Sequence, residues 1–462
     1  MRKKQNRDRR KTAGHRASEP VVREIDVERM GLAADGEGML DGRPAFVFNA
    51  LPGERVEARI TERGRSVFRA ETVRVRKASP HRVAAACPAY GVCGGCNLMH
   101  LCYEQQLIYK QELVERAMAQ IGGFPHPPVR PCLPSPEVFG YRHKVQMPVR
   151  AAGKTLRIGF FARDSRRVVP LDSCPVHCRE GDRIYRRIRQ LVLEMQIPAY
   201  HDGTRSGLLR HILIRTTRPQ DESLVCLITA EKQGDELPAL ARALLEAHPR
   251  IRGVVQNINP AEGDLILGRE TVLLAGRSFI AEEIDGIRLR IAAPSFFQVN
   301  AGQVPCLLEL VRRFLDGAAR GILLDAYCGV GLYSLCLAGR AESVIGIESA
   351  PDAVRDARGN ARENQIANAR FLSGRVEDVL AQIRHAHGVV LNPPRSGCEP
   401  GVLRALHKMS PERVVYVSCN PASLARDLKG LSAAYRVEDV QPVDLFPQTG
   451  HVETVAALRR RK

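Results

Sequence analysis

Cys419 stands just beyond an apolar run, residues 413–417, that predicts a buried strand. A thiol held rigidly at the tip of such a strand can act as a nucleophile once it loses its proton. Residues 422–431 predict a helix, whose positive N-terminal end would favour the thiolate. The alternative is that Cys419 is simply a small buried apolar residue, as many isolated cysteines are.

Two further segments carry side chains that favour the chemical interpretation. Asn392 follows the apolar run 389–391 and opens a rigid Asn-Pro-Pro-Arg turn, where its amide could hydrogen-bond a nucleobase or a cofactor. Glu453 follows a glycine turn in the segment FPQTGHVET, where a general base could be held. A simple proline turn and an exposed strand carboxylate are the respective alternatives.

A glycine turn follows the strand predicted at 322–324, which ends at Asp325. Gly329 and Gly331 allow a tight turn into a helix, and a second apolar run, 344–347, ends in Glu348. A carboxylate about 20 residues past such a turn can accept hydrogen bonds from ribose hydroxyls. Since the third glycine of a pyrophosphate-binding turn is missing, S-adenosylmethionine suits the turn better than a dinucleotide. A turn that binds nothing is the alternative.

These elements predict the fold of residues 291–462. Apolar strands at 322–325, 344–348, 388–391 and 413–418 alternate with turns and helices. Such alternation is typical of an α/β domain with a doubly wound, Rossmann-like parallel sheet, whose ligand site lies outside the carboxyl ends of the strands. Each side chain above falls at such an end.

Thirteen cysteines are present, and four have metal-ligand spacing. Cys87, Cys93 and Cys96 lie close together around a Gly-Gly pair, and Cys174 can supply a fourth thiolate. We favour an iron–sulfur cluster, because the paired C-x2-C hooks common in zinc sites are absent. Zinc and unligated thiols are the alternatives, and Cys102 and Cys178 are rival ligands.

The N-terminal part of the 462-residue chain is basic and rich in strands. Residues 1–18 predict a disordered tail, since the first sixteen carry eight Lys or Arg and one Asp. Alternating residues within 19–79, such as Val56 and Ala58, or Val73 and Val75, predict a small β-barrel with a basic outer face. The formal charge of +18 indicates a polyanionic partner such as RNA.

Residues 80–290 predict a mixed α/β central domain with helices at 103–121 and 235–248. Segments 141–144 and 208–211 combine cations with aromatic or imidazole rings and are candidate RNA contacts, or else solvated strand residues. No apolar run is long enough to cross a bilayer, and no secretory signal opens the chain, so we expect a cytoplasmic protein with reduced thiols.

Six segments in order resemble the RNA uracil-C5 methyltransferase family over residues 23–457. They are FFQVN (296–300), the D-x-x-CG-x-G turn (325–331), GIE (346–348), NPPRSG (392–397), SCNP (418–421) and FPQTGHVE (446–453). The resemblance implies a TRAM domain, which is OB-like, for the barrel, and a central RNA-binding domain before the methyltransferase domain. The cysteines match members that carry a 4Fe–4S cluster, which mostly modify 23S rRNA.

The resemblance also implies site roles. Cys419 matches the nucleophile that adds to C6 of uracil, and Glu453 matches the base that removes the C5 proton. The cofactor S-adenosylmethionine would be held at positions matching Gln298, Tyr327, Gly329, Glu348 and Asn392. Phe296 is a candidate stacking partner for a flipped-out base.

Two residues depart from the family pattern. Asn392 stands where Asp is usual, and Leu332 where Asn is usual. We expect these two changes to lower the affinity for the cofactor more than they alter the reaction. Three other functions stay open: methylation of tRNA, N-methylation through the Asn-Pro-Pro-Arg turn, and RNA-binding assembly without catalysis. We expect a monomer with no obligate protein partner and no membrane association.

Overall fold

The computed structural model describes residues 21–462 except 153–154, 202, 219–221, 233–235, 262 and 264. The chain divides into two compact units, one ending at Arg82 and one running from Val83 to Lys462. The predicted tail, 1–18, lies outside the described residues. Among the helices of the described residues, none is both long enough and apolar enough to cross a bilayer.

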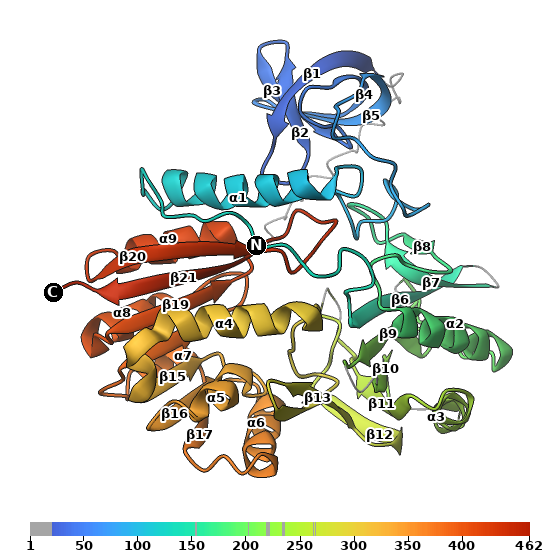
Figure 1. Ribbon diagram of the computed structural model, residues 1–462. Coiled ribbons are helices and arrows are strands. Elements are labelled where there is room, and N and C mark those ends of the chain that lie inside the picture. The colour runs from blue at the N-terminus through green and yellow to red at the C-terminus, as the bar shows by residue number, and fades with distance from the viewer. Residues whose placement is uncertain are drawn as a thin grey trace, which may run out of the picture. The chain divides into compact units, whose positions relative to one another are not determined.

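The first unit is a closed five-stranded barrel, blue in Figure 1. Its strands are β1 (Val22–Met30), β2 (Gly36–Leu40), β3 (Arg43–Phe48), β4 (Arg55–Arg63) and β5 (Phe68–Lys77). Val56 and Ala58 are buried inside it, as the alternation predicts. Val73 is not, because the β4–β5 register shifts between the Glu57–Arg74 and Ala58–Thr72 pairs. Val73 is the extra residue of that bulge and points outward, 57% exposed.

The first sheet of the second unit has seven strands, in the order β12-β11-β10-β9-β6-β7-β8. They are β6 (Lys144–Ala152), β7 (Thr155–Phe161), β8 (Val168–Pro170), β9 (Leu209–Thr216), β10 (Ser223–Thr229), β11 (Ile251–Ile258) and β12 (Glu270–Gly276). Helices α2 (Arg179–Glu194) and α3 (Glu236–Ala247) contribute to one core with this sheet. Helix α3 was predicted from the sequence, whereas α2, whose Ile184 and Ile188 are fully buried, was not.

The prediction that segments 141–144 and 208–211 contact RNA is wrong for most of their residues. Every residue of β9 is buried, because the strand is central in its sheet and covered on both faces. Arg210 donates to the carbonyl oxygens of Asn259 and Ala261 at 2.5 and 2.7 Å. Tyr141 and His143 are buried as well. These cations and rings stabilise the fold instead.

A second seven-stranded sheet has the order β17-β16-β15-β18-β19-β21-β20. Its strands are β15 (Ile322–Ala326), β16 (Ser343–Glu348), β17 (Ala369–Ser373), β18 (Gly388–Leu391), β19 (Arg413–Ser418), β20 (Tyr435–Val443) and β21 (Glu453–Arg460). The first five are mutually parallel, which confirms the four strands predicted from the sequence. Strands β17 and β20, and the antiparallel strand β21 that separates β19 from β20, were not predicted.

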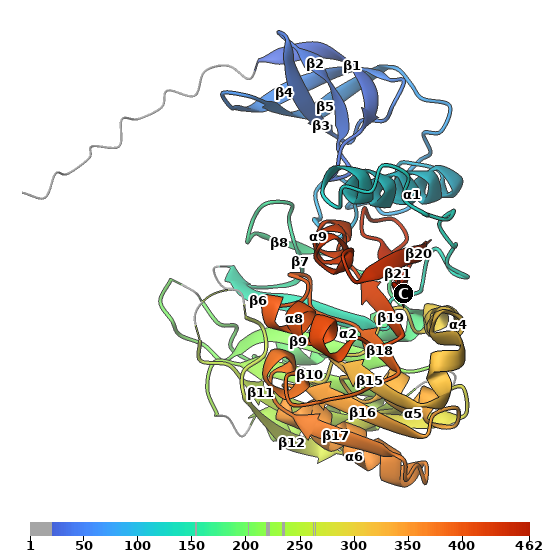
Figure 2. The ribbon, with the colours of Figure 1, turned by 90° about the vertical axis from the view of Figure 1, so that its left-hand side faces the viewer.

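Helices cover both faces of this sheet (Figure 2). They are α4 (Val304–Leu315), α5 (Leu332–Ala338) and α6 (Pro351–Glu363) on one face, and α7 (Val376–Leu380), α8 (Pro400–Met409) and α9 (Pro421–Leu431) on the other. Short 3₁₀ turns, η1 (Ala301–Gln303) and η2 (Asp316–Arg320), flank α4, and a hairpin of β13 (Phe279–Ile284) and β14 (Ile287–Ala292) precedes it.

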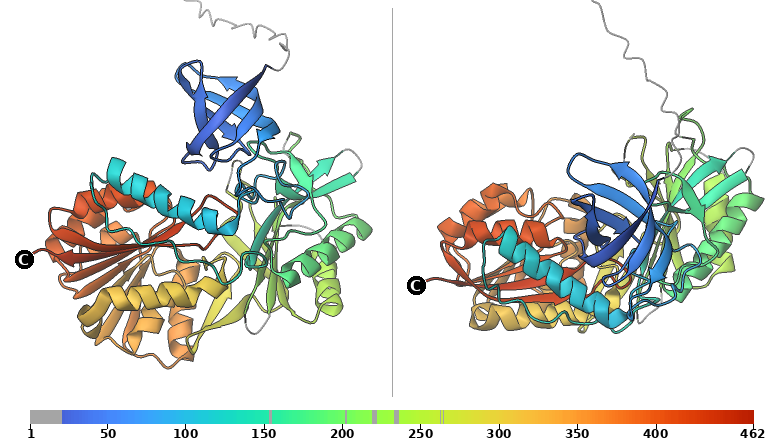
Figure 3. Two further views of the ribbon diagram at one scale, coloured as in Figure 1. Left: turned by 45° about the horizontal axis from the view of Figure 1, so that its top comes forward. Right: turned by 90° about the horizontal axis from the view of Figure 1, so that it is seen from above.

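The predicted helix at 103–121 is present as α1 (Tyr103–Gln120). It lies along α9 and β20 of the C-terminal sheet, more than 300 residues away in the chain (Figure 3). Val114 and Met118 are fully buried on the face that the periodicity predicts. The segment that follows the first three cysteines is therefore packed onto the sheet that carries the candidate site.

Candidate functional site

The glycine turn after β15 is built around Glu348, the last residue of β16. Tyr327 and Cys328 donate their backbone N–H groups to the Ile347 carbonyl at 2.9 and 3.0 Å. One Glu348 carboxylate oxygen accepts from Gly329 N at 3.1 Å, and the other accepts from Ala350 N at 2.8 Å. The oxygen bonded to Ala350 also accepts from the Ser349 hydroxyl at 3.2 Å. A carboxylate has about four acceptor sites, so about one stays available for a ribose hydroxyl.

Gly331 shows why this turn requires glycine. Its φ is +91°, and an added Cβ would lie 3.2 Å from the Phe371 ring. Gly329 also has positive φ, and the Phe296 carbonyl lies 3.8 Å from where its Cβ would be. The segment that holds Phe296 and Gln298 therefore passes directly beside the turn.

The other predicted cofactor residues fall around the same strand ends. Tyr327 has a φ of +70°, which is rare outside glycine and places it at the tip of β15. Asn392 follows β18, and its backbone N–H donates to the Ala326 carbonyl at 3.3 Å. Gln298 is buried, whereas the Phe296 side chain is 60% exposed. Leu332 is buried in the hydrophobic core at the start of α5.

Cys419 lies between the end of β19 and α9, as predicted, and is half-buried. Asn420 caps α9 by accepting the Ala422 N–H at 3.1 Å. The pKa of Cys419 is nevertheless raised, chiefly by burial and then by the negative charge of Glu453, while Arg395 opposes the shift. The positive N-terminal end of α9 is therefore not sufficient to keep Cys419 deprotonated, as the sequence had suggested it would be.

Glu453 is the first residue of β21 and is buried. β21 pairs with β19 so that Thr454 lies opposite Ser418, which places Glu453 and Cys419 at adjacent strand ends. Burial raises the pKa of Glu453 to about 8, against the opposing charge of Arg395. A carboxyl group with a pKa in this range is suited to general-base work near neutral pH.

Arg395 is the site residue that the sequence analysis did not single out. Its positive charge opposes the rise that burial causes in the pKa of both Cys419 and Glu453. Its carbonyl accepts from the Asn420 side chain at 2.9 Å, and its guanidinium donates to the His451 ring at 3.3 Å. It thus connects the three loops that carry Asn392, Cys419 and Glu453. Its position as a cation in the Asn-Pro-Pro-Arg turn was the sequence signal that could have identified it.

The four predicted cluster cysteines lie near one another as free thiols. Burial and then the neighbouring Cys174 raise the pKa of Cys96 to about 12, and Cys93 and Cys87 add to the shift. Backbone N–H groups face two of the sulfurs: that of Gly95 faces Cys93, and those of Val176 and His177 face Cys174.

The chemistry of this donor set fits a tetrathiolate cluster, since such N–H groups stabilise cluster sulfurs. As the side chains stand, no group of three or more His, Cys, Asp or Glu in the described ranges is arranged to hold a metal ion. The rival Cys178 instead accepts the Gly181 N–H at 3.4 Å and caps α2. The cluster stays a prediction.

Comparisons with known proteins identify relatives of the whole chain. A family model described as tRNA (Uracil-5-)-methyltransferase matches residues 266–461. An uncharacterized RNA methyltransferase of Halalkalibacterium halodurans is 39% identical over 94% of this chain and 96% of its own length. Another, from Gloeobacter violaceus, is 42% identical over the same shares.

Solved structures include a crystal structure that is similar over nearly the whole chain. It is that of Pyrococcus abyssi tRNA (uracil-54, C5)-methyltransferase in complex with S-adenosyl-L-homocysteine. It superposes with a TM-score of 0.75 at 27% sequence identity, and the match covers 94% of this chain and 100% of that one.

Proposed function

Because the chain belongs to the RNA uracil-C5 methyltransferase family, we propose that it methylates C5 of a uridine in structured RNA, using Cys419 as the nucleophile. The observation that carries this proposal is the pairing of β19 with β21, which brings a half-buried thiol and a buried carboxyl group to the same edge of the sheet. The cofactor turn around Glu348 opens at that edge too.

The proposed reaction gives each residue a separate task. S-adenosylmethionine, when bound, supplies an electrophilic methyl group. Cys419 adds to C6 of the uracil ring as the thiolate, which pushes electron density onto C5 and makes that carbon the nucleophile. After methyl transfer Glu453 takes the C5 proton, and the electrons of that C–H bond expel the Cys419 thiolate.

Arg395 would lower the cost of the first step. The pKa of Cys419 is raised by burial, so forming a thiolate there requires a compensating positive charge. The Arg395 guanidinium provides it, and it also moderates the pKa of Glu453. Phe296, whose backbone carbonyl lies beside the glycine turn and whose side chain is exposed, would stack on an extruded base.

Trapping with 5-fluorouridine tests the reaction type. A fluorine at C5 cannot be removed as a proton, so the wild-type protein with cofactor should accumulate a covalent RNA–protein complex. Mass analysis of ordinary RNA, without fluorine, after the reaction should place the new methyl group on carbon 5. A methyl group on an exocyclic nitrogen would support the Asn-Pro-Pro-Arg alternative, and no cofactor binding at all would support a non-catalytic role.

We propose 23S rRNA as the substrate class, since the cysteine set matches the cluster-carrying members of the family. The barrel, as a TRAM-like module, and the net charge of +18 support an RNA partner. Methylation of 23S rRNA fragments and tRNA, measured side by side, decides between the two RNAs. We also propose that the protein works in the cytoplasm, where the cysteines outside the proposed cluster would stay reduced.

Changing Glu348 to alanine is expected to weaken S-adenosylmethionine binding by at least about tenfold, because a ribose contact and the Gly329 and Ala350 hydrogen bonds are lost together. Calorimetry measures the dissociation constant. Glu342→Ala, an exposed carboxylate before the same strand, is the matched control and should bind normally. Equal affinity in both variants would remove Glu348 from the site.

We propose that Cys87, Cys93, Cys96 and Cys174 hold a 4Fe–4S cluster that supports the local fold. Changing Cys96 to serine should then remove most of the bound iron and the broad absorbance near about 400 nm, measured after anaerobic purification. Cys306→Ser, which changes a half-buried thiol on α4, should retain both. Wild-type protein that contains zinc in place of iron would contradict the assignment.

A further inference from the structure

The loop that leads into Glu453 contains a strained residue. Gln448, between β20 and β21, has a φ of +70° and is buried. A side chain other than glycine occupies this left-handed region at a cost, and it persists only where neighbouring groups over-determine the conformation. Three residues later the loop presents His451 to Arg395, and two residues after that it reaches Glu453.

The neighbouring groups come from α1 and from the segment after Cys96. Gln106 of α1 accepts from the Gln448 N–H at 2.9 Å and donates to the Gln448 side chain at 3.1 Å. The Gln448 carbonyl accepts from the backbone N–H groups of Asn97 and Leu98 at 3.2 and 3.0 Å. The Asn97 side chain accepts from Gly450 N at 2.8 Å. Every polar group of the strained peptide unit is thus held from outside the loop.

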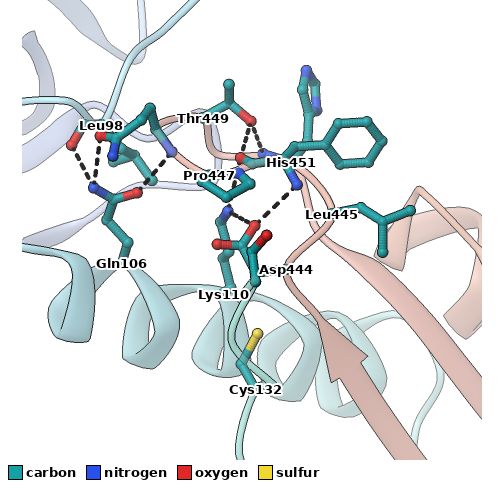
Figure 4. Close-up of polar contacts among 12 residues, drawn as sticks. Leu98, Gln106, Lys110, Cys132, Asp444, Leu445, Pro447, Thr449 and His451 are labelled. Carbon is teal, nitrogen blue, oxygen red and sulfur yellow. Dashed lines mark hydrogen bonds and ion pairs between the residues drawn. The ribbon is translucent and has the colours of Figure 1, made fainter. Parts of the chain in front are cut away.

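A fully buried ion pair fixes the start of the same loop (Figure 4). Lys110 of α1 donates to Asp444 at 2.5 Å and to the Phe446 carbonyl at 3.0 Å, and both charged side chains are completely buried. Asp444 in turn accepts from Phe446 N at 3.0 Å. Because α1 lies 334 residues from Asp444 in the chain, these bonds attach the loop to a separate packed element.

We infer that Lys110 and Gln106 are positioning residues for proton removal: they hold the loop over residues 444–451 so that Glu453 faces C5 of the bound uracil. The inference rests on the proposed function. Both side chains are buried, which keeps them out of reach of an RNA substrate, and neither belongs to the loop that carries Cys419. Replacing either residue should therefore slow removal of the C5 proton, which needs Glu453. The addition of Cys419 to C6 should keep its rate.

Lys110→Met is the main test. Displacing a catalytic group by about 1 Å can lower a rate about 10²-fold, so kcat should fall by that order. The KM for RNA and the dissociation constant of S-adenosylmethionine should stay within about twofold. The 5-fluorouridine adduct should form at the wild-type rate, while a methylated covalent intermediate accumulates on ordinary RNA. Lys408→Met, an exposed lysine on α8, is the matched control with unchanged kinetics.

A double variant separates positioning from stability. In Lys110→Met/Asp444→Leu the buried charges are replaced together, and such an apolar pair can restore or exceed the original stability. Since the bond to the Phe446 carbonyl is still missing, kcat should stay low and the backbone amides of 446–451 should exchange hydrogen faster than in the wild type. Recovery of wild-type kcat in the double variant would overturn the inference.

The failures of the two proposals are distinguishable. Wild-type protein that forms no 5-fluorouridine adduct contradicts the proposed function itself. Wild-type protein that forms the adduct, together with a Lys110→Met variant that turns over normally, contradicts only the positioning role. Gln106→Leu should show the same selective loss as Lys110→Met, since it removes both bonds to Gln448. An equal slowing of adduct formation and turnover would likewise contradict positioning.

Discussion

Replacing Cys419 with alanine is expected to abolish turnover, lowering kcat by at least about 10⁴-fold, because alanine has no nucleophile to add to C6. S-adenosylmethionine binding should be unchanged, since the cofactor turn lies on β15 and β16 while Cys419 follows β19. Methyl transfer to RNA, measured with a radiolabelled methyl group, checks the first expectation, and calorimetry checks the second.

The control for this substitution is Cys306→Ala. It changes a thiol of similar burial on α4 and should leave turnover intact. The 5-fluorouridine adduct should form with the control variant and disappear with Cys419→Ala. An alanine variant that still methylates C5 would exclude covalent catalysis by this residue.

Replacing Glu453 with glutamine is expected to lower kcat by about 10³-fold, within the range that general bases contribute. The step lost is removal of the C5 proton, so the methyl group should be transferred and the RNA should then stay attached to Cys419. Denaturing gels that resolve an RNA–protein band carrying the labelled methyl group measure this. Glu412→Gln, an exposed carboxylate just before β19, is the control and should leave no such band.

The pH dependence of the wild type follows from the same group. With a pKa of about 8, Glu453 is protonated below that value and cannot accept a proton there. The rate of the proton-removal step should therefore rise as the pH increases through about 8, and this limb should be missing in Glu453→Gln. A wild-type profile that is flat between about pH 6 and 9 would contradict the role of Glu453.

Apolar runs, helical periodicity and turn residues predicted the elements that depend mainly on neighbouring residues in the chain. The four apolar runs of the C-terminal domain became β15, β16, β18 and β19, because buried parallel strands need continuous apolar residues. Helix α1 followed its periodicity for a similar reason. Cys419 and Glu453 could be placed at strand ends, since each stands next to a recognisable turn.

The remainder depends on contacts between distant residues. Helix α2 was missed although Ile184 and Ile188 have helical spacing, because its many arginines obscure the apolar face until the sheet covers it. The contact of Lys110 with Asp444 joins residues 334 positions apart, and no local signal marks it. The raised pKa of Cys419 likewise comes from burial and from Glu453, which only the folded chain supplies.

The antiparallel pairing of β21 with β19 has a consequence for how this sequence can change over evolution. Six successive residue pairs, from Arg413–Arg459 to Ser418–Thr454, fix one strand against the other. Adding or deleting one residue within β21 would shift that alignment by one and rotate Glu453 to the opposite side of the sheet. The carboxylate would then meet a layer of helices. The paired part of β21 can therefore diverge by exchanging side chains, whereas a change in its length would be selected against.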